Sequence, residues 1–431
     1  MKKILFDATI LASGIHKNEC RSGLFVASYE LFKRLLDVSD LEIDIYASLS
    51  TRSDVKKYIL QEIPSFRGNF VGDFSEHWLC RLRNQIEAQR GRQCNKIRKL
   101  FLRACAVFCK CLCYIVDRDA GNYIPQNELK KYDCFFSPVY LAPRFIYRSG
   151  IPRYTVLYDI IPKLFPQFCP SVRVGLSWNI DLINNLNEKD FCFAISEQTK
   201  KDFLKFNSKL IPEKITVIPL AADEKKFYPC QELSKITAVR AKYQIPEKPY
   251  FLSLCTIEPR KNLIFALKAF DAYLAKYPES ELTFVLAGGH WSRFAGKWES
   301  ALAEMKHIKK RIILTGYIDD EDLAALYSGA EFFIYPSLYE GFGLPPLEAM
   351  QCGCPVITSN TSSLPEVVGN AGIMIAPDDL EGAVNAIESL LHNQALRKKY
   401  INGGLERAAR FKWEKAAEII TDVIERNCNA K

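Results

Sequence analysis

The sequence is poor in the residues that build metal centres. It has only five histidines in 431 residues. The four cysteines in residues 105–113 include no CxxC pair and have no histidine nearby, whereas structural zinc sites use such pairs at fixed spacings. We therefore expect packed thiols in this stretch and no metal in the functional site. Low-complexity tracts and repeats of solenoid period are also missing, which argues against a repeat architecture.

The composition is that of a globular protein, with 48% apolar and 25% charged residues, and the length suggests two domains. The fifteen cysteines are an odd number, and several of them (Cys192, Cys255 and Cys354) lie inside apolar runs. We therefore expect free thiols in a reducing cytoplasm rather than a disulfide framework. Asp7 interrupts the first apolar run, so we interpret residues 2–8 as a buried strand and not as part of a signal peptide.

The positive charge of the chain is concentrated in one stretch. The formal net charge is +8, and residues 81–110 hold nine Arg or Lys and one Glu, so the rest of the chain is balanced. An apolar run over 104–116 is broken only by Lys110 and is too short to cross a bilayer. We expect residues 78–116 to lie on an anionic membrane, at the inner face of the cell membrane. A core helix with a solvated basic neighbour is the alternative, and nucleic acid has less support because aromatics do not interleave with the basic residues.

Both halves of the chain alternate short apolar strands with helices. In the first half the expected strands are 2–8, 41–47, 134–138, 154–159, 190–196 and 215–223, and the expected helices are 24–36 and 197–206. After a charged connector, the second half has expected strands at 250–256, 282–289, 311–317, 331–337 and 355–359, and helices at 262–277, 319–330, 345–353 and 378–393. This alternation predicts α/β domains with doubly wound parallel sheets. The expected domains are 1–235 and 236–410, followed by a helix over 411–431 that crosses back to the first domain.

Chemically distinctive residues follow several of the expected strands. Ligands of doubly wound sheets bind beyond the carboxyl ends of the strands, and these ends meet at one edge of each sheet. The residues found at such positions are Gly23, Asp159, Ser196, Arg260, Gly288, Gly316 and Glu340. We therefore expect the functional site at these strand ends.

The stretch YEGFGLPPLE joins an expected strand to an expected helix. Pro345 or Pro346 suits the first helical turn, because proline lacks the amide hydrogen that would be unpaired there. The loop over 340–344 then offers backbone N–H groups at the positive end of the helix dipole, which is a seat for phosphate. Glu348 would point away from the phosphate towards sugar hydroxyls, and Glu340 would face the group that the phosphate carries. Either glutamate alone is explained as well by helix capping.

The stretch CTIEPRKN is a second strand end of the same expected sheet. It places Arg260 and Lys261 in a loop before a helix. A diphosphate needs such cations to offset its charge and to stabilise it as a leaving group. An Arg–Lys pair in a loop is by itself more often a solvated surface pair, so the interpretation depends on the shared sheet.

Several motifs resemble those of family-4 retaining glycosyltransferases of the GT-B fold, in the same order along the chain. The second half carries TIEPRKN, LAGG, TGYIDDEDLAALYSGA, YPSLYEGFGLPPLEAMQCGCPVITSNTSSLPEVVGNAG and FKWEKAA, and the first half carries YDIIPKLFP, FAISEQTKKDF and ITVIPLAADEKKFYP. The resemblance covers most of the chain except about residues 50–130, and the two glutamates of YEGFGLPPLE have the family's spacing. It implies two Rossmann-like domains that face each other across a cleft. It also implies a UDP- or GDP-sugar as donor substrate and no further cofactor.

The resemblance implies roles for individual residues. Glu340 would contact the donor sugar, and Glu348 the nucleotide ribose. The Arg–Lys pair and the loop amides would hold the diphosphate, and the turn at Tyr317 would lie along the base. The implied donor-binding residues are Arg260, Lys261, Gly341, Phe342, Gly343, Leu344, Glu348, Tyr317, Ile318, Ser22 and Gly23, and the implied catalytic residues are Glu340, Asp159 and Tyr158.

Two positions depart from the family pattern. Many members carry an arginine after the first strand of the second domain, where this chain has Cys255 or Thr256, so more of the diphosphate charge is left to the Arg–Lys pair. Many also carry His-Asp where this chain has Tyr158 and Asp159. A tyrosine offers a hydroxyl, but it is not a base that works near neutral pH.

The expected function is that of a retaining hexosyltransferase. It would move a hexose from a nucleotide sugar to a glycan or a polyprenyl-diphosphate-linked saccharide, in the assembly of a bacterial surface polysaccharide such as O-antigen, capsule or exopolysaccharide. The alternatives are a nucleotide-sugar epimerase of the same fold and a non-catalytic glycan- or lipid-binding relative. An epimerase has no need of a basic membrane-facing insert. The residues that argue against a binding protein are the intact Glu340, Glu348, Arg260 and Lys261.

Overall fold

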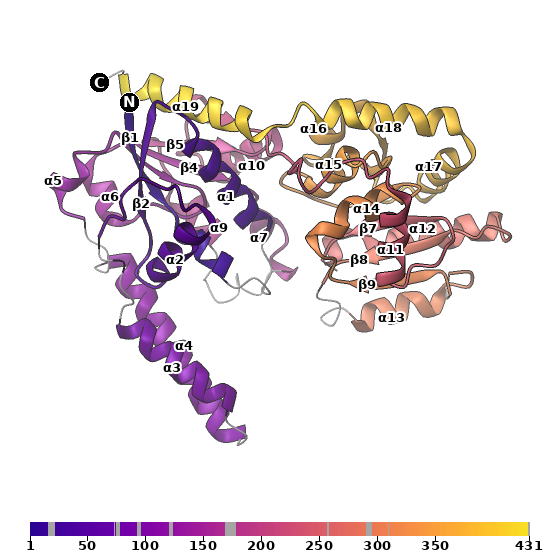
Figure 1. Cartoon of the computed structure of the whole chain (residues 1–431), viewed down its shortest axis with the longest axis horizontal. Coiled ribbons are helices and arrows are strands. Elements are labelled where there is room, and N and C mark those ends of the chain that lie inside the picture. Colours follow the sequence, from indigo (N-terminus) through magenta and orange to yellow (C-terminus); the bar gives the residue numbers. More distant parts are fainter. Residues whose placement is uncertain are drawn as a thin grey trace.

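The chain folds into two α/β halves, each built on one parallel sheet with helices packed around it (Figure 1). The computed structural model describes residues 1–15, 22–72, 74, 78–92, 96–119, 124–168, 178–256, 258–289, 295–308 and 310–429. Both sheets have six strands. The prediction of two doubly wound parallel-sheet domains is therefore confirmed.

The first sheet has the strand order β2-β1-β3-β4-β5-β6, and its paired strands are parallel. The strands are β1 Lys2–Asp7, β2 Leu41–Tyr46, β3 Cys134–Ser137, β4 Arg153–Leu157, β5 Asp190–Ala194 and β6 Ile215–Val217. The helices of this half are α1 Gly23–Leu36, α2 Arg52–Glu62, α3 Trp78–Arg92, α4 Lys96–Asp119, α5 Gln126–Leu129, α6 Arg144–Ser149, α7 Ile161–Leu164, α9 Trp178–Asn185 and α10 Glu197–Phe206. Strand β4 is buried along its whole length, as expected for a parallel strand that is covered on both faces.

The second sheet has the strand order β12-β11-β10-β7-β8-β9. Its strands are β7 Tyr250–Leu254, β8 Thr283–Ala287, β9 Ile312–Gly316, β10 Phe333–Tyr335, β11 Val356–Ser359 and β12 Ile373–Ile375. The helices are α11 Leu233–Lys242, α12 Leu263–Lys276, α13 Ala295–Glu304, α14 Leu323–Ser328, α15 Leu344–Gln351, α16 Leu364–Val368, α17 Leu380–His392 and α18 Gln394–Ala408. The chain order reverses between the adjacent strands β7 and β10, and doubly wound sheets bind ligands at such a switch point.

Five elements of the second half had no counterpart in the expectations. They are the strand β12 and the helices α11, α13, α16 and α18, of which α11 lies in the charged connector over 225–248. Strand β12 has only three residues, which is too short for a clear period-2 pattern. Helix α18 is mostly polar, with Gly404 and Ala408 as its buried residues, so its sequence shows little apolar periodicity.

The last helix, α19 Trp413–Asn429, leaves the second half and lies along the first half (Figure 1). It packs against α1, and Glu414 forms an ion pair with Arg34 of α1 at 3.2 Å. The apolar side chains that it buries recur every three or four residues, as on one face of a helix; they are Trp413, Ala416, Ala417, Ile420 and Ile424. This helix therefore connects the two halves covalently and by packing.

The basic stretch forms a helical hairpin of α3 and α4, which projects from the first half (Figure 1). Much of the apolar surface of α4 is exposed, so the alternative of a core helix with a solvated basic neighbour is wrong. None of the helices in the described ranges combines the length and the hydropathy that a bilayer span requires.

Candidate active site

The loop between β10 and α15 occupies the switch point of the second sheet. Helix α15 begins at Leu344 with Pro345 in its first turn, as predicted from the two prolines. Gly343 precedes the helix with φ +128°, and a Cβ at this position would lie 2.9 Å from Leu364 Cδ2. Only glycine suits both the dihedral angle and the close contact. Pro345 and Pro346 have no N–H, and the Leu347 N–H donates to the Gly343 carbonyl, so the start of α15 presents the amides of Gly343 and Leu344 from a tightly held loop.

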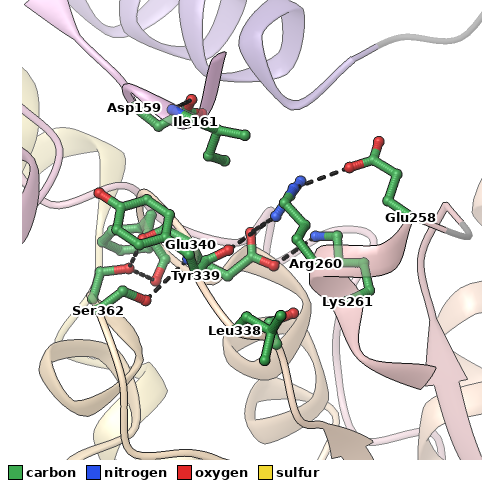
Figure 2. A network of polar contacts seen from close by, with 12 residues as sticks. Asp159, Ile161, Glu258, Arg260, Lys261, Leu338, Tyr339, Glu340 and Ser362 are labelled. Atoms are coloured by element: carbon green, nitrogen blue, oxygen red, sulfur yellow. Dashed lines mark hydrogen bonds and ion pairs between the residues drawn. The ribbon is translucent and has the colours of Figure 1, made fainter. Parts of the chain in front are cut away.

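Glu340 in this loop lies between two cations from the neighbouring strand end (Figure 2). Its Oε1 accepts a hydrogen bond from Lys261 Nζ at 2.7 Å, and its Oε2 lies 2.8 Å from Arg260 Nη1. All three side chains are nearly buried, with 10–13% exposure. Burial alone would raise the pKa of Glu340, but the charges of Lys261 and Arg260 outweigh it and lower the pKa to about 2.

The two cations are held by their own strand-end loop. They lie in the 3₁₀ turn Pro259–Lys261, which follows β7 directly before α12. Leu338 N donates to the Arg260 carbonyl at 2.7 Å, which joins the β7 loop to the β10 loop. Arg260 also donates through Nη1 to the Tyr339 carbonyl and through Nε to Glu258, and Lys261 Nζ donates to the Tyr335 hydroxyl. The structure thus brings together the two strand ends that the sequence linked only through a shared sheet.

The first half contacts this loop directly. A Cβ on Gly341 would lie 2.8 Å from Asp159 Cβ and 3.1 Å from the Tyr158 carbonyl oxygen. The Gly341 carbonyl accepts hydrogen bonds from Ser196 Oγ at 2.7 Å and from Thr199 Oγ1 at 3.2 Å. The loop after β10 is therefore packed against the carboxyl ends of β4 and β5, with no room for a larger residue at Gly341.

We call Glu340, Arg260 and Lys261 the ion cluster. Asp159 of the first half faces it (Figure 2). Its Oδ1 accepts a hydrogen bond from Ile161 N at 3.0 Å, and Asn179 donates to its carbonyl at 2.9 Å. Burial raises the pKa of Asp159 above its ordinary value, and the Ile161 amide and the charge of Arg260 oppose that rise. Asp159 therefore remains in the candidate site, although it also caps its own turn.

The structure does not support the inclusion of Tyr158 among the catalytic groups. Adjacent residues of an extended chain point to opposite faces, so Tyr158 turns away from the side on which Asp159 lies. Its hydroxyl lies 3.3 Å from Ser28 Oγ of α1, and the residue is 4% exposed within the main apolar core. Its hydroxyl is therefore part of the packing between β4 and α1.

The start of α1 in the first half faces the start of α15 in the second half. We call the contact between the two halves the junction. Ser22 caps α1 by accepting a hydrogen bond from Phe25 N at 3.3 Å. Leu344 Cδ1 lies 3.9 Å from the position that a Cβ on Gly23 would take. Two helix N-termini, each with a positive end of its dipole, therefore converge on the same junction. Arg21, which precedes Ser22, lies outside the described residues.

Glu348 lies on α15 and contacts a different neighbour from Glu340. Its Oε2 accepts a hydrogen bond from Tyr327 of α14 at 3.1 Å. Burial raises its pKa to about 7, and the hydrogen bond from Tyr327 opposes that rise. The two glutamates therefore have opposite shifts: Glu340 is a fixed anion, whereas Glu348 titrates near neutral pH.

The expected base-binding turn lies at the end of β9, two strands away from the switch point. The side chain of Tyr317 is 67% exposed, whereas that of Ile318 is buried and can present only its backbone. Gly288 N donates to the Gly316 carbonyl at 2.8 Å, and a Cβ on Gly288 would lie 2.2 Å from the Cys255 carbonyl oxygen. These glycines thus hold the ends of β7, β8 and β9 close together.

Sequence reasoning assigned no role to several residues that support the site. The Glu340 amide donates to Ser362 Oγ at 2.9 Å, and Ser363 Oγ donates to the Glu340 and Phe342 carbonyls. Glu366 of α16 accepts the N–H groups of Glu197 and Gln198 at 2.7 and 2.8 Å, so it binds the N-terminus of α10 in the first half. Ser362, Ser363 and Glu366 all lie in the motif TSSLPEVV, but only the folded chain shows which groups they contact.

Comparisons with known proteins agree with this architecture. The sequence profile of glycosyl transferases group 1 matches residues 235–407. Escherichia coli O-antigen chain mannosyltransferase B is 33% identical over 278 residues, which cover 64% of this chain and 71% of that protein. The E. coli serotype-specific mannosyltransferase WbdA is 30% identical over 268 residues, but the matched part covers only 32% of its length.

Solved structures show the same fold at low sequence identity. Anabaena HepE, solved in complex with UDP-glucose, has a TM-score of 0.63 at 15% identity over 99% of this chain and all of that chain. WaaG, a glycosyltransferase involved in lipopolysaccharide biosynthesis, has a TM-score of 0.59 at 14% identity over 98% of this chain and 99% of that one. The fold is thus the GT-B arrangement, and the chain belongs to the family of group 1 glycosyl transferases.

Proposed function

We propose that this glycosyltransferase moves a hexose from a nucleotide-diphosphate sugar to a glycan or a lipid-linked saccharide, with retention at the anomeric carbon, in the assembly of a bacterial surface polysaccharide. The observation that carries the proposal is the pair of buried cations, Arg260 and Lys261, at the switch point beside the N-terminus of α15. A diphosphate fits this combination of charge and N–H donors. The mannosyltransferase names of the relatives make GDP-mannose the first donor to test, and the UDP-glucose complex of HepE makes UDP-glucose the second.

In this proposal the protein acts by orientation and charge stabilisation. Arg260 and Lys261, with the amides of Gly343 and Leu344, stabilise the diphosphate as it leaves. The sugar then gains positive charge, which the carboxylate of Glu340 stabilises beside the anomeric carbon. An acceptor hydroxyl attacks from the face that the diphosphate leaves, and the departing phosphate takes its proton. No strong protein base is required, and we propose no cofactor beyond the donor itself.

The closure between the halves supports transfer over hydrolysis. The Gly341 loop packs on Asp159, and Glu366 binds the N-terminus of α10. In the proposal these contacts hold the two halves together around the reacting carbon, and such closure excludes water. Asp159 is the carboxyl group that the first half contributes beside the ion cluster.

A donor screen tests the proposal. The purified chain is incubated with membrane extract and a panel of nucleotide sugars that includes GDP-mannose and UDP-glucose, and release of the nucleoside diphosphate is measured. Mass analysis of the product then identifies the transferred sugar, and the anomeric configuration shows whether it is retained. Glu340→Ala should abolish release without loss of the fold. Failure to release a nucleoside diphosphate from any donor contradicts the transferase proposal, and an inverted product contradicts retention alone.

A further inference from the structure

Helix α4 of the projecting hairpin has two apolar faces. One face packs towards α3: Ala106 and Cys109 are buried, and Leu102, Cys105 and Leu112 are half-buried. The second face is exposed. Its large apolar side chains are between 54% and 81% exposed and recur at spacings of three, four and seven residues, which place them on one side of a helix; they are Ile97, Leu100, Phe101, Val107 and Phe108. We call these five residues the α4 stripe.

Exposed apolar side chains are ordinary when they are scattered, but here they are concentrated. Seven of the fifteen exposed large apolar side chains in the described ranges lie on the hairpin, because Trp78 and Leu82 of α3 add to the α4 stripe. Helix α4 has 24 residues and is therefore about 36 Å long. A contiguous exposed apolar stripe over several helical turns marks an interaction site, so we expect a surface of comparable length to cover it.

Basic residues run beside the α4 stripe. Successive residues of an α-helix are about 100° apart around its axis, so Lys99 and Arg103 lie beside Val107, at one edge of the α4 stripe. Both side chains are exposed. Within residues 81–110 the basic residues outnumber the acidic ones by nine to one, and the one glutamate, Glu87, is paired with Arg90 at 2.9 Å. The surface that covers the α4 stripe must therefore have an apolar interior and anionic groups where it meets water.

We propose that the α4 stripe docks on an anionic lipid bilayer, with α4 in the plane of the interface, the stripe among the acyl chains and Lys99 and Arg103 on lipid phosphates. A second copy of the hairpin is disfavoured, because it would bring two clusters of the same charge together. The proposal does not rest on the proposed function, and its test requires no turnover. If both hold, the hairpin brings the first half to the surface that carries a lipid-linked acceptor.

Vesicle co-sedimentation of the full chain tests the proposal. Vesicles of phosphatidylcholine alone are compared with vesicles containing about one third phosphatidylglycerol, at low and at high salt. The wild-type chain should bind the anionic vesicles at least tenfold more tightly than the neutral ones, and high salt should weaken the binding. Absence of binding, or equal binding to both vesicle types, overturns the proposal.

Two variants separate the apolar and the electrostatic parts. Leu100→Ser/Phe101→Ser/Phe108→Ser should lose binding at both salt concentrations, by at least tenfold. Its control is Leu233→Ser, at an equally exposed apolar position of the second half. Lys99→Ser/Arg103→Ser should weaken binding about thirtyfold at low salt and less at high salt, since each basic residue near the surface contributes about 1 kcal/mol. Its control is Lys398→Ser/Lys399→Ser on α18, where both residues are exposed.

The same variants distinguish a lipid surface from a second copy of the chain. Light scattering of the wild-type chain and of the stripe variant gives the oligomeric state without vesicles. A wild-type dimer that the stripe variant converts to a monomer, with vesicle binding unchanged, overturns the proposal in favour of a second copy. Unchanged oligomeric state with lost vesicle binding supports the lipid surface. Circular dichroism confirms that the substituted, exposed positions leave the helices intact.

Discussion

Replacement of Glu340 by glutamine removes a charge from the candidate site and little else. The two side chains have nearly the same shape, so the loop after β10 keeps its packing. Arg260 and Lys261 then lose the carboxylate that lies 2.8 and 2.7 Å from them, while their side chains stay only 13% and 10% exposed. Lys261 then lacks a paired carboxylate and Arg260 keeps only the partly exposed Glu258, so the desolvation of the two cations is less well offset and the folded state is destabilised.

The magnitude of the loss follows from the pKa of Glu340. The pKa falls from an ordinary 4.5 to about 2. This shift corresponds to about 3 kcal/mol in the free energy of unfolding, which agrees with the roughly 3–5 kcal/mol that a broken buried ion pair costs. Because the folded state lowers the pKa, this stability is complete above about pH 5 and is lost as the pH falls towards 2. At about 2–4 °C per kcal/mol, Glu340→Gln should lower the melting temperature by about 6–12 °C.

Thermal unfolding at pH 7, with and without UDP or GDP, measures this effect. The nucleoside diphosphate should raise the melting temperature of the variant more than that of the wild type, because its phosphates replace the lost carboxylate. The control Glu281→Gln breaks the surface ion pair between Glu281 and Lys248 and should leave the melting temperature close to that of the wild type. An unchanged melting temperature in Glu340→Gln refutes the ion-cluster reasoning. A smaller stabilisation by the diphosphate than in the wild type refutes the role of the two cations.

Two further predictions concern the nucleotide and the junction. The resemblance assigns Glu348 to the nucleotide ribose. Because burial raises its pKa to about 7, a carboxylate that would accept hydrogen bonds from the ribose hydroxyls forms as the pH rises through neutrality, so the affinity for the nucleoside diphosphate should rise by up to about tenfold between pH 6 and 8. Calorimetry should show no such step in Glu348→Gln, and a pH-independent wild type contradicts the assignment. Gly341→Ala places a Cβ 2.8 Å from Asp159 Cβ and should reduce transfer at least tenfold with little effect on diphosphate binding, whereas Gly289→Ala, with nothing within 4 Å, should resemble the wild type. Equal turnover of both alanine variants contradicts a tight junction.

The part of the site that could be predicted from sequence depends on sheet topology. Strands β7 and β10 are adjacent, so the loops that follow them meet at one edge of the sheet. Local motifs were sufficient to identify both loops, because glycine, proline and paired cations each have a specific use at a helix start. The apolar alternation of strands and helices likewise predicted both sheets.

The remaining features depend on side-chain direction and on contacts between distant segments. Tyr158 and Asp159 are adjacent in an extended chain, so their side chains point to opposite sides and only one of them can face the site. A motif match does not show which one it is. The contact between Glu366 and the N-terminus of α10 joins segments that are 168 residues apart in sequence. The two apolar faces of α4 are mixed in the sequence with basic residues, so only the packing of α3 against one face shows that the other is exposed.

The ion cluster has a consequence for how a diphosphate binds. Arg260 and Lys261 already neutralise Glu340, and the pKa of about 2 means that this carboxylate is charged at any physiological pH. A diphosphate carries the same sign of charge and needs the same cations, so the two anions compete for them. In the proposed mechanism this competition would weaken if the Glu340 carboxylate turned from the cations towards a sugar that gains positive charge. Arg260 and Lys261 would then link two events: as they bind the diphosphate, they would release the carboxylate of Glu340 to face the sugar.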